Sequence, residues 1–198
     1  MADCNLLTRS ISPDCENPMV PGVGKRAWIY PLSVWQAAAK VLDNTDTNLI
    51  TSFVLASGDT GIYLDVPSGV AIEPSYTANV GTFGTTFLHQ VILRVFKNNL
   101  KIKQQVEKLN RGEFVVIVEN NYKGDDDDVA FEVYGYTAGL RASEAGRTVN
   151  DVDSLGSYTM TLASQETQPE PRLPLSYLDT DYATSLAALN ASVTATQA

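Results

Sequence analysis

The chain has 198 residues, 44% of them hydrophobic, and a formal net charge of −9 at pH 7. This hydrophobic fraction is enough for a core, so the composition argues against wholesale disorder and fits one domain with appended arms. The acidic balance argues against sequence-specific nucleic-acid binding, which needs a basic surface against the phosphates. Because no apolar run reaches about 18 residues, no membrane-spanning helix is expected.

The N-terminus predicts neither export nor a metal site. Its first residues lack the basic and apolar segments of a signal peptide, so we expect the chain to fold in the cytosol. The two cysteines, Cys4 and Cys15, have no histidine nearby and do not complete a zinc site. In a reducing compartment we expect both to be unpaired thiols.

Residues 1–24 predict an extended N-terminal arm, because prolines and glycines interrupt any regular element there. A short strand is predicted at 26–30. Ser33 and Gln36 form a capping-box pattern, which predicts a short helix over 35–42.

A strand-rich stretch follows. Candidate strands at 49–56 and 61–66 flank residues 57–60, whose Ser-Gly-Asp-Thr sequence favours a hairpin turn. A further strand is predicted at 70–76. Residues 78–85 are rich in Gly and Thr and predict a mobile loop.

Residues 86–166 are the most regularly organised part of the sequence. A strand at 86–96 is apolar on both faces, so we expect it to be central or covered on each side by a partner. A short basic helix around 98–110 has a narrow apolar stripe that would lie against a sheet. Strands are then predicted at three positions, with a polar loop before the last: 113–119, 129–136 and 157–163.

Charged residues in this unit are unevenly distributed. Six of the fourteen Lys and Arg residues fall on or near the basic helix: Arg94, Lys97, Lys101, Lys103, Lys108 and Arg111. They form either a solvated helix face or a cationic patch that meets an acidic patch on a neighbouring subunit. The acidic candidates for that contact are four consecutive residues: Asp125, Asp126, Asp127 and Asp128. As a hairpin tip, these aspartates would otherwise serve to block edge aggregation.

The sequence contains few residues in patterns that are typical of catalytic sites. His89 is the single histidine, and its place among apolar residues of a strand is typical of a core or interface histidine. The Asp-Thr-Gly at residues 59–61 has no second copy with which to form a carboxylate dyad. Four adjacent aspartates lack the spacing, glycine and distal glutamate of a calcium loop. We therefore expect no enzyme, cofactor or metal site.

The order of elements in this unit resembles that of the tail tube proteins of tailed bacteriophages. It runs from a strand through the basic helix to two strands around an acidic loop, then through Gly-Tyr-x-x-Gly-Leu at 135–140 and a polar loop to a last strand. It is also similar to the related ring-forming proteins of the head–tail connector. The likeness rests on residues 93–109, 114–118 and 129–140, and on the closing strand at 156–162 and the exit at 166–174. The sequences at 14–18 and 21–24 also resemble structural proteins of phages from gut bacteria.

This resemblance implies a mainly β fold with minor α, a tail-tube-like β-sandwich or barrel flanked by one short helix, with extended arms at both ends. The expected division is an N-terminal arm at 1–24, a ring-forming domain at 25–166 and a C-terminal arm with a short helix at 167–198. The implied role is a virion structural protein, assembled in the host cytoplasm. Its partners would be copies of itself, in a hexamer or larger ring, adjacent tail or portal proteins, and genomic DNA that passes without specific binding.

An alternative is a β-sandwich binding module for carbohydrate or a host surface, as in head decoration or fibre proteins. Tyr134 and Tyr136 are predicted to share one strand face, which would suit a glycan platform, although such pairs on a strand are more typical of interface or core packing.

Overall fold

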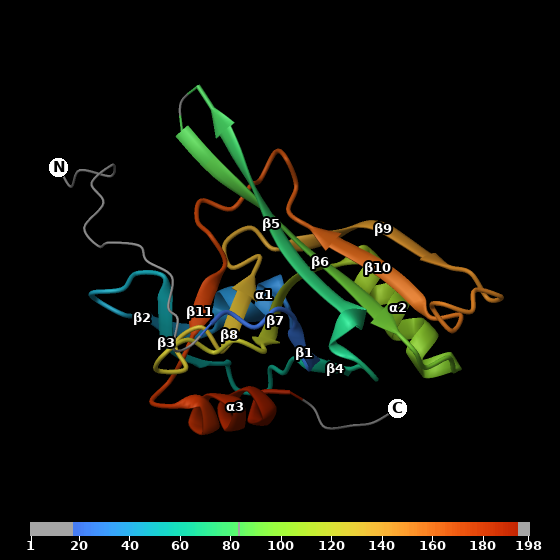
Figure 1. The fold of residues 1–198 in the computed structure, drawn as a ribbon, viewed down its shortest axis with the longest axis horizontal. Helices are drawn as coiled ribbons and strands as arrows, with labels where there is room; N and C mark the ends of the chain where they lie inside the picture. The colour runs from blue at the N-terminus through green and yellow to red at the C-terminus, as the bar shows by residue number, and fades with distance from the viewer. Residues whose placement is uncertain (1–17, 83, 194–198) are drawn as a thin grey trace.

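A computed structural model describes residues 18–82 and 84–193 (Figure 1). Eleven strands lie in these ranges. The strands are β1 (Val23–Pro31), β2 (Ala39–Leu42), β3 (Leu49–Val54), β4 (Ile62–Asp65), β5 (Ile72–Gly81), β6 (Gly84–Val95), β7 (Glu113–Asn120), β8 (Phe131–Tyr134), β9 (Leu140–Arg147), β10 (Tyr158–Ala163) and β11 (Leu175–Tyr177). The helical elements are α1 (Leu32–Ala37), α2 (Leu100–Arg111), α3 (Tyr182–Ala191) and the 3-10 turn η1 (Gly69–Ala71).

The strands form one open, mixed sheet. Their order is β2-β3-β11-β8-β7-β9-β10-β6-β5, and β1 joins the sheet by pairing with β7 and β4. The pairs are antiparallel except for β3 with β11. The predicted class, mainly β with minor α, is confirmed. Among the described residues, three α-helices accompany the sheet: α1, α2 and α3.

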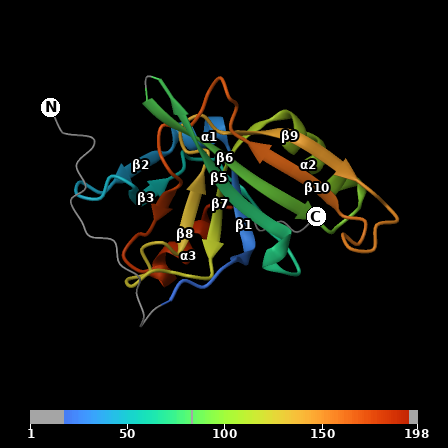
Figure 2. The same ribbon diagram turned by 45° about the horizontal axis from the view of Figure 1, so that its top comes forward.

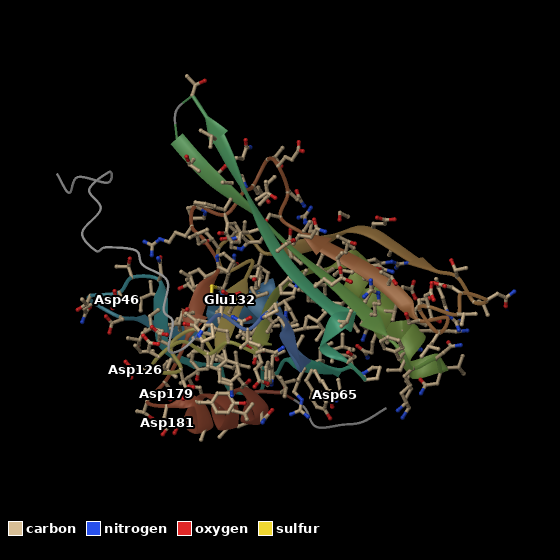
Figure 3. All side chains as sticks on the ribbon, in the orientation of Figure 1. Asp46, Asp65, Asp126, Glu132, Asp179 and Asp181 are labelled. Atoms are coloured by element: carbon tan, nitrogen blue, oxygen red, sulfur yellow. The ribbon has the colours of Figure 1, made fainter. Side chains whose placement is uncertain are left out.

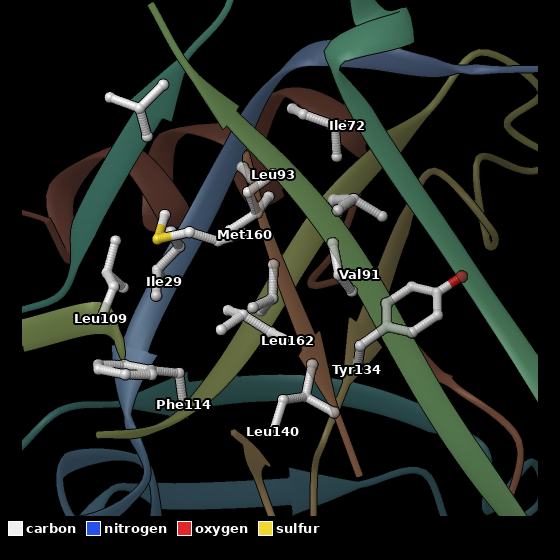
Figure 4. Close-up of a cluster of buried hydrophobic side chains, with 14 of the residues drawn as sticks. Ile29, Ile72, Val91, Leu93, Leu109, Phe114, Tyr134, Leu140, Met160 and Leu162 are labelled. Atoms are coloured by element: carbon white, nitrogen blue, oxygen red, sulfur yellow. The ribbon is translucent and has the colours of Figure 1, made fainter. Parts of the chain in front are cut away.

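The β1–β7 pair lies at the centre and is buried on both faces. Trp28 lies opposite Ile117, and Ile29 lies opposite Val116. Because successive side chains of a strand point to opposite faces, these pairs enter two different cores. The first core includes residues of β6, β10 and α2 (Figure 4). The second includes residues of α1, α3, β3, β8 and β11.

The helix predicted over 35–42 is wrong in position. The sequence is helical earlier, in α1, where Trp35 is fully buried in the second core. Ala39–Leu42 instead forms β2, which pairs with β3. Ser33 makes no capping bond, because Pro31 occupies the N-cap position.

The hairpin predicted over 49–66 is also wrong. Both strands exist, but β3 pairs with β2 and β11, whereas β4 pairs with β1. An ion pair between Arg26 Nε and Asp65 Oδ1, at 2.7 Å, joins β1 to β4. The turn at 57–60 therefore connects β3 and β4, which do not pair with each other. Each strand pairs instead with at least one strand that is distant along the chain.

Two segments that were predicted as loops contain strands. Residues 78–81 belong to β5 and residues 84–85 to β6, and the two strands pair up to Gly81 opposite Gly84. The polar segment before the last predicted strand contains β9, which pairs with β10. Both segments are largely exposed, so they lack the alternation of apolar residues by which a strand is recognised in a sequence.

The C-terminal segment 167–198 was predicted as an arm, but its described residues are part of the domain. β11 lies between β3 and β8 in the sheet. The Tyr182 ring of α3 stacks on Phe131 with 5.4 Å between ring centroids, and Leu189 is fully buried. Of the arm predicted at 1–24, residues 1–17 lie outside the described part, and β1 already begins at Val23.

We expect Leu189→Ala to lower the free energy of unfolding by about 2–4 kcal/mol, because it leaves a cavity in the second core. Ala187→Ser changes an exposed position of the same helix and should cost about 0.5 kcal/mol. Urea unfolding followed by tryptophan fluorescence measures both. Equal effects of the two substitutions would mean that α3 does not dock on the core.

Candidate assembly surfaces

β5 and β6 form a long hairpin that projects from the body of the domain, as Figures 1 and 2 both show. The strands pair from Ile72 opposite Leu93 to Gly81 opposite Gly84. Ile72 is buried at the base, whereas side chains of β5 from Ser75 onward are exposed. Pairing with β6, rather than a core, therefore holds the outer half of β5.

The outer edge of β5 is unpaired. β5 ends the sheet order, and no strand in the described ranges pairs with its other side. Proteins usually protect such edges with charges or proline, because the free N–H and C=O groups pair readily with other chains. Here Glu73 and Pro74 lie only at the base, and no residue from Ser75 to Leu93 is Asp, Glu, Lys or Arg. The edge is open to a partner strand.

A buried polar cluster fastens the base of this hairpin to the body. His89 of β6 is 1% exposed. Its Nδ1 accepts the N–H of Gly135 at 3.2 Å, so Nε2 carries the proton and donates to the carbonyl oxygen of Arg172 at 3.0 Å. Both ring nitrogens are satisfied, as expected of a core histidine.

Glu170 is the second member of this cluster and was missed in the sequence. Its buried carboxylate accepts the backbone N–H groups of Thr137 and Ala138 at 2.8–3.0 Å. Its own backbone N–H and C=O bond to Phe87 of β6 at 2.9 and 2.8 Å. The one signal in the sequence is its place between Pro169 and Pro171, which restrict the backbone on both sides.

α2 carries most of the predicted basic patch. Asn99 caps the helix by accepting the N–H of Ile102 at 2.8 Å, and the predicted apolar stripe faces the first core. The side chains of Lys101, Lys103 and Lys108 are exposed on the opposite side, and Lys97 lies in the segment before the helix.

The predicted acidic residues lie in the loop between β7 and β8. Asp125, Asp126 and Asp128 are exposed, and Asp127 is half-buried with a φ of 60°. Figure 3 places Asp126 near Asp46, Asp179 and Asp181, at the left of the view. α2 lies at the right of the same view, along the longest axis of the molecule (Figure 1). One chain therefore does not bring the two charged groups together but holds them at opposite ends.

The loop between β9 and β10, residues 148–157, is a further surface that was not identified in the sequence. It exposes Val149, Val152 and Leu155 at 67%, 82% and 75%. Leu155 has a φ of 52°, a left-handed conformation that costs a non-glycine residue about 1–2 kcal/mol. A positive φ at a leucine has no signature in the sequence.

Tyr134 and Tyr136 pack on the cores and do not form a glycan platform. Tyr134 is 4% exposed in the first core, and its hydroxyl donates to Glu132 at 2.7 Å. Tyr136 lies beyond the strand end, after Gly135 with its φ of 75°, and packs on Trp35 in the second core. The two rings therefore face different cores.

Within the described ranges, no group of three or more His, Cys, Asp and Glu side chains is arranged to hold a metal ion. None of the described helices is long and apolar enough to cross a membrane. Comparison of the chain with protein-family models, with curated proteins and with solved structures finds no match in any of the three.

We expect acidification from pH 7.5 to 5.5 to lower the free energy of unfolding. Burial lowers the pKa of His89 from its ordinary 6.5, and the nearby Glu170 carboxylate only partly offsets this. Below pH 6.5 the unfolded chain then binds a proton that the folded chain does not, so stability falls by up to about 1.4 kcal/mol per pH unit. Urea unfolding at several pH values measures the slope.

His89 is the only histidine, so His89→Gln should flatten this slope, whatever its effect on stability at pH 7.5. A wild-type stability that stays constant or rises on acidification would contradict the assignment of a buried, neutral His89.

Proposed function

We propose that this chain is a non-enzymatic virion structural protein of a tailed bacteriophage. Copies of it assemble into a ring or tube in the tail or the head–tail connector, and genomic DNA passes through the channel without specific binding. The observation that carries the proposal is the projecting β5–β6 hairpin, which is uncharged from Ser75 to Leu93 and open along its outer edge.

The hairpin is a poor surface for an isolated protein. Exposed side chains of β5 include Tyr76 at 51% and Val80 at 78%. An exposed edge with high strand propensity and no charge associates with other strands, and soluble monomers avoid it. A neighbouring copy that covers this edge would satisfy its backbone groups and remove the exposed apolar area from water.

The charges at the two ends of the long axis support the same proposal. The basic helix α2 lies at one end, and the acidic loop that carries Asp126 lies at the other. Opposite charges at the two ends would let one copy attract the next in a head-to-tail arrangement. Such heterologous contacts either close into a ring or continue as an open filament. A two-fold contact between the same ends of two copies would instead place like charges against each other.

The net charge of −9 supports the role of a channel. A negatively charged wall repels the phosphates of DNA, so the duplex slides without adhering. The adjacent partners in this proposal are tail or portal proteins of the same virion, and the subunits assemble in the host cytoplasm.

We expect Thr77→Lys to weaken self-association at least tenfold, because a lysine on an edge strand opposes strand pairing. Thr77 is exposed on β5, so the substitution should change the free energy of unfolding by about 0.5 kcal/mol or less. Thr77→Val is the matched control, since it keeps the site uncharged and strand-forming. Sedimentation velocity and negative-stain microscopy measure assembly.

We expect the double substitution Lys101→Glu and Lys103→Glu to impair assembly more than it lowers folding stability. The exposed lysines make little contact within the chain, but their reversal would turn attraction between copies into repulsion. Raising the salt concentration should narrow the difference between wild type and variant, because salt screens exposed charges. Equal losses of assembly and stability would show that this face of α2 is not an interface.

A further inference from the structure

The β9–β10 loop, residues 148–157, forms the right-hand extremity of the molecule in Figure 1. Its three exposed apolar side chains, Val149, Val152 and Leu155, alternate with Asp151 and Asp153. A loop tip of this kind usually consists of small and polar residues. Three large apolar side chains gathered on one short loop instead indicate a contact surface.

The loop is held in one conformation by its own hydrogen bonds. The Asp151 side chain accepts the N–H of Asp153 at 3.1 Å, and the Gly156 N–H donates to the carbonyl oxygen of Asp151 at 3.1 Å. The Arg147 Nε donates to the carbonyl oxygen of Gly156 at 2.7 Å. The apolar side chains are therefore presented before any partner arrives.

The conformation and exposure of Leu155 contribute little to folding stability. Leu155 and Gly156 are both left-handed, with φ of 52° and 64°. Glycine or asparagine would suit the first position better. A leucine there strains the backbone, and its side chain is 75% exposed, so it adds little to the core. Strain of this kind persists where function requires the side chain.

A small apolar cleft is lined by Leu42 of β2, by the turn after β8 and by the segment 170–175 that leads into β11. Figure 1 shows β2 and β11 to the left of the centre and the β9–β10 loop at the right. It has a volume of about 220 Å³, and its apolar lining includes Leu42, Tyr136, Leu173 and Leu175. Glu170 also lines it, but this carboxylate is 1% exposed and accepts the backbone N–H groups of Thr137 and Ala138. Arg172 also lines the cleft and is exposed, and its Nη1 donates to the carbonyl oxygen of Thr47 at 2.8 Å. No ion pair to Arg172 occurs among the described residues.

We propose that the β9–β10 loop of one copy docks into this cleft of the next, with Leu155 as the anchor and Asp151 and Asp153 facing Arg172. The proposal rests on the self-assembly proposed above and assigns one of its contacts. Apolar side chains flanked by carboxylates fit an apolar cleft flanked by a guanidinium. The loop and the elements that line the cleft are different parts of the surface, so this docking is a heterologous, head-to-tail contact.

Two other hollows fit the loop less well. The larger one beside Tyr134 is lined by Glu73 and Glu132 and, among the described residues, by no Lys or Arg, so its lining offers no cation to the aspartates of the loop. The groove between α2 and β1 is lined by Leu109 and Phe114 but carries both Lys108 and the partly exposed Glu113, so its charge does not favour the aspartates of the loop.

Leu155→Asn tests the proposal, because asparagine accepts the left-handed conformation and removes the apolar anchor. We expect unchanged or higher resistance to urea and at least a tenfold weaker self-association by sedimentation. Val70→Asn is the matched control, since Val70 is 76% exposed and lies in η1, outside the proposed contact. It should assemble like the wild type.

Cysteine cross-linking locates the contact. In a background with Cys4→Ser and Cys15→Ser, copies with Leu155→Cys are mixed with copies with Leu173→Cys and oxidised. A disulfide-linked dimer that forms in the mixture, and in neither variant alone, supports the docking.

The outcomes separate the two proposals. If the wild type assembles while Leu155→Asn assembles equally well, or the mixture gives no mixed dimer, the docking is overturned and self-assembly stands. A wild type that stays monomeric at high concentration overturns both.

Discussion

The pairing of β1 with β7, buried on both faces, is the constraint on which the rest of the structure depends. Trp28 and Tyr30 enter one core, whereas Ala27 and Ile29 enter the other. β7 divides its apolar run in the same way. A slip of one residue would exchange the side chains that reach each core, so bulky aromatic groups would meet a space shaped for aliphatic ones. The register is therefore fixed from both sides.

The two cores also decide where the charged and open surfaces lie. The first core receives Val106 and Leu109 of α2, which turns the lysines of that helix outward. The second core holds α3 and β11, near the loop that carries Asp126 (Figure 3). Because the cores lie on opposite sides of one strand pair, the basic and acidic groups are separated by the body of the domain. The charge separation is thus a consequence of packing.

Elements with their own apolar pattern could be predicted from the sequence. β1, β6, β7, β10 and α2 all appear close to their expected positions, because burial imposes alternation or a helical stripe on each. β9 and the outer part of β5 could not be predicted, since exposed strands are held by backbone pairing that leaves little trace in side-chain type. The partner of β4 was missed because it depends on β1, which is distant along the chain. The charged residues of the candidate surfaces were identified from the sequence. Their positions at opposite ends of the molecule, the burial of Glu170 and the strained backbone of Leu155 depend on the three-dimensional fold and could not be identified in this way.

Hydrogen bonds hold the β5–β6 hairpin and the β9–β10 loop, two exposed surfaces of the single chain, in defined conformations. The hairpin is anchored at its base by His89 and Glu170, whose hydrogen bonds link β6 to the β8–β9 turn and to the segment after β10. The β9–β10 loop is fixed by the turn around Asp151. Rigid surfaces lose little conformational entropy when they bind, so even modest contacts between copies retain most of their free energy. Fixing an open strand edge and an apolar loop brings no benefit to a monomer, because both invite aggregation. It does benefit a subunit whose neighbours must join in one defined orientation, and this is the physical reason for proposing that the chain is one part of a larger assembly.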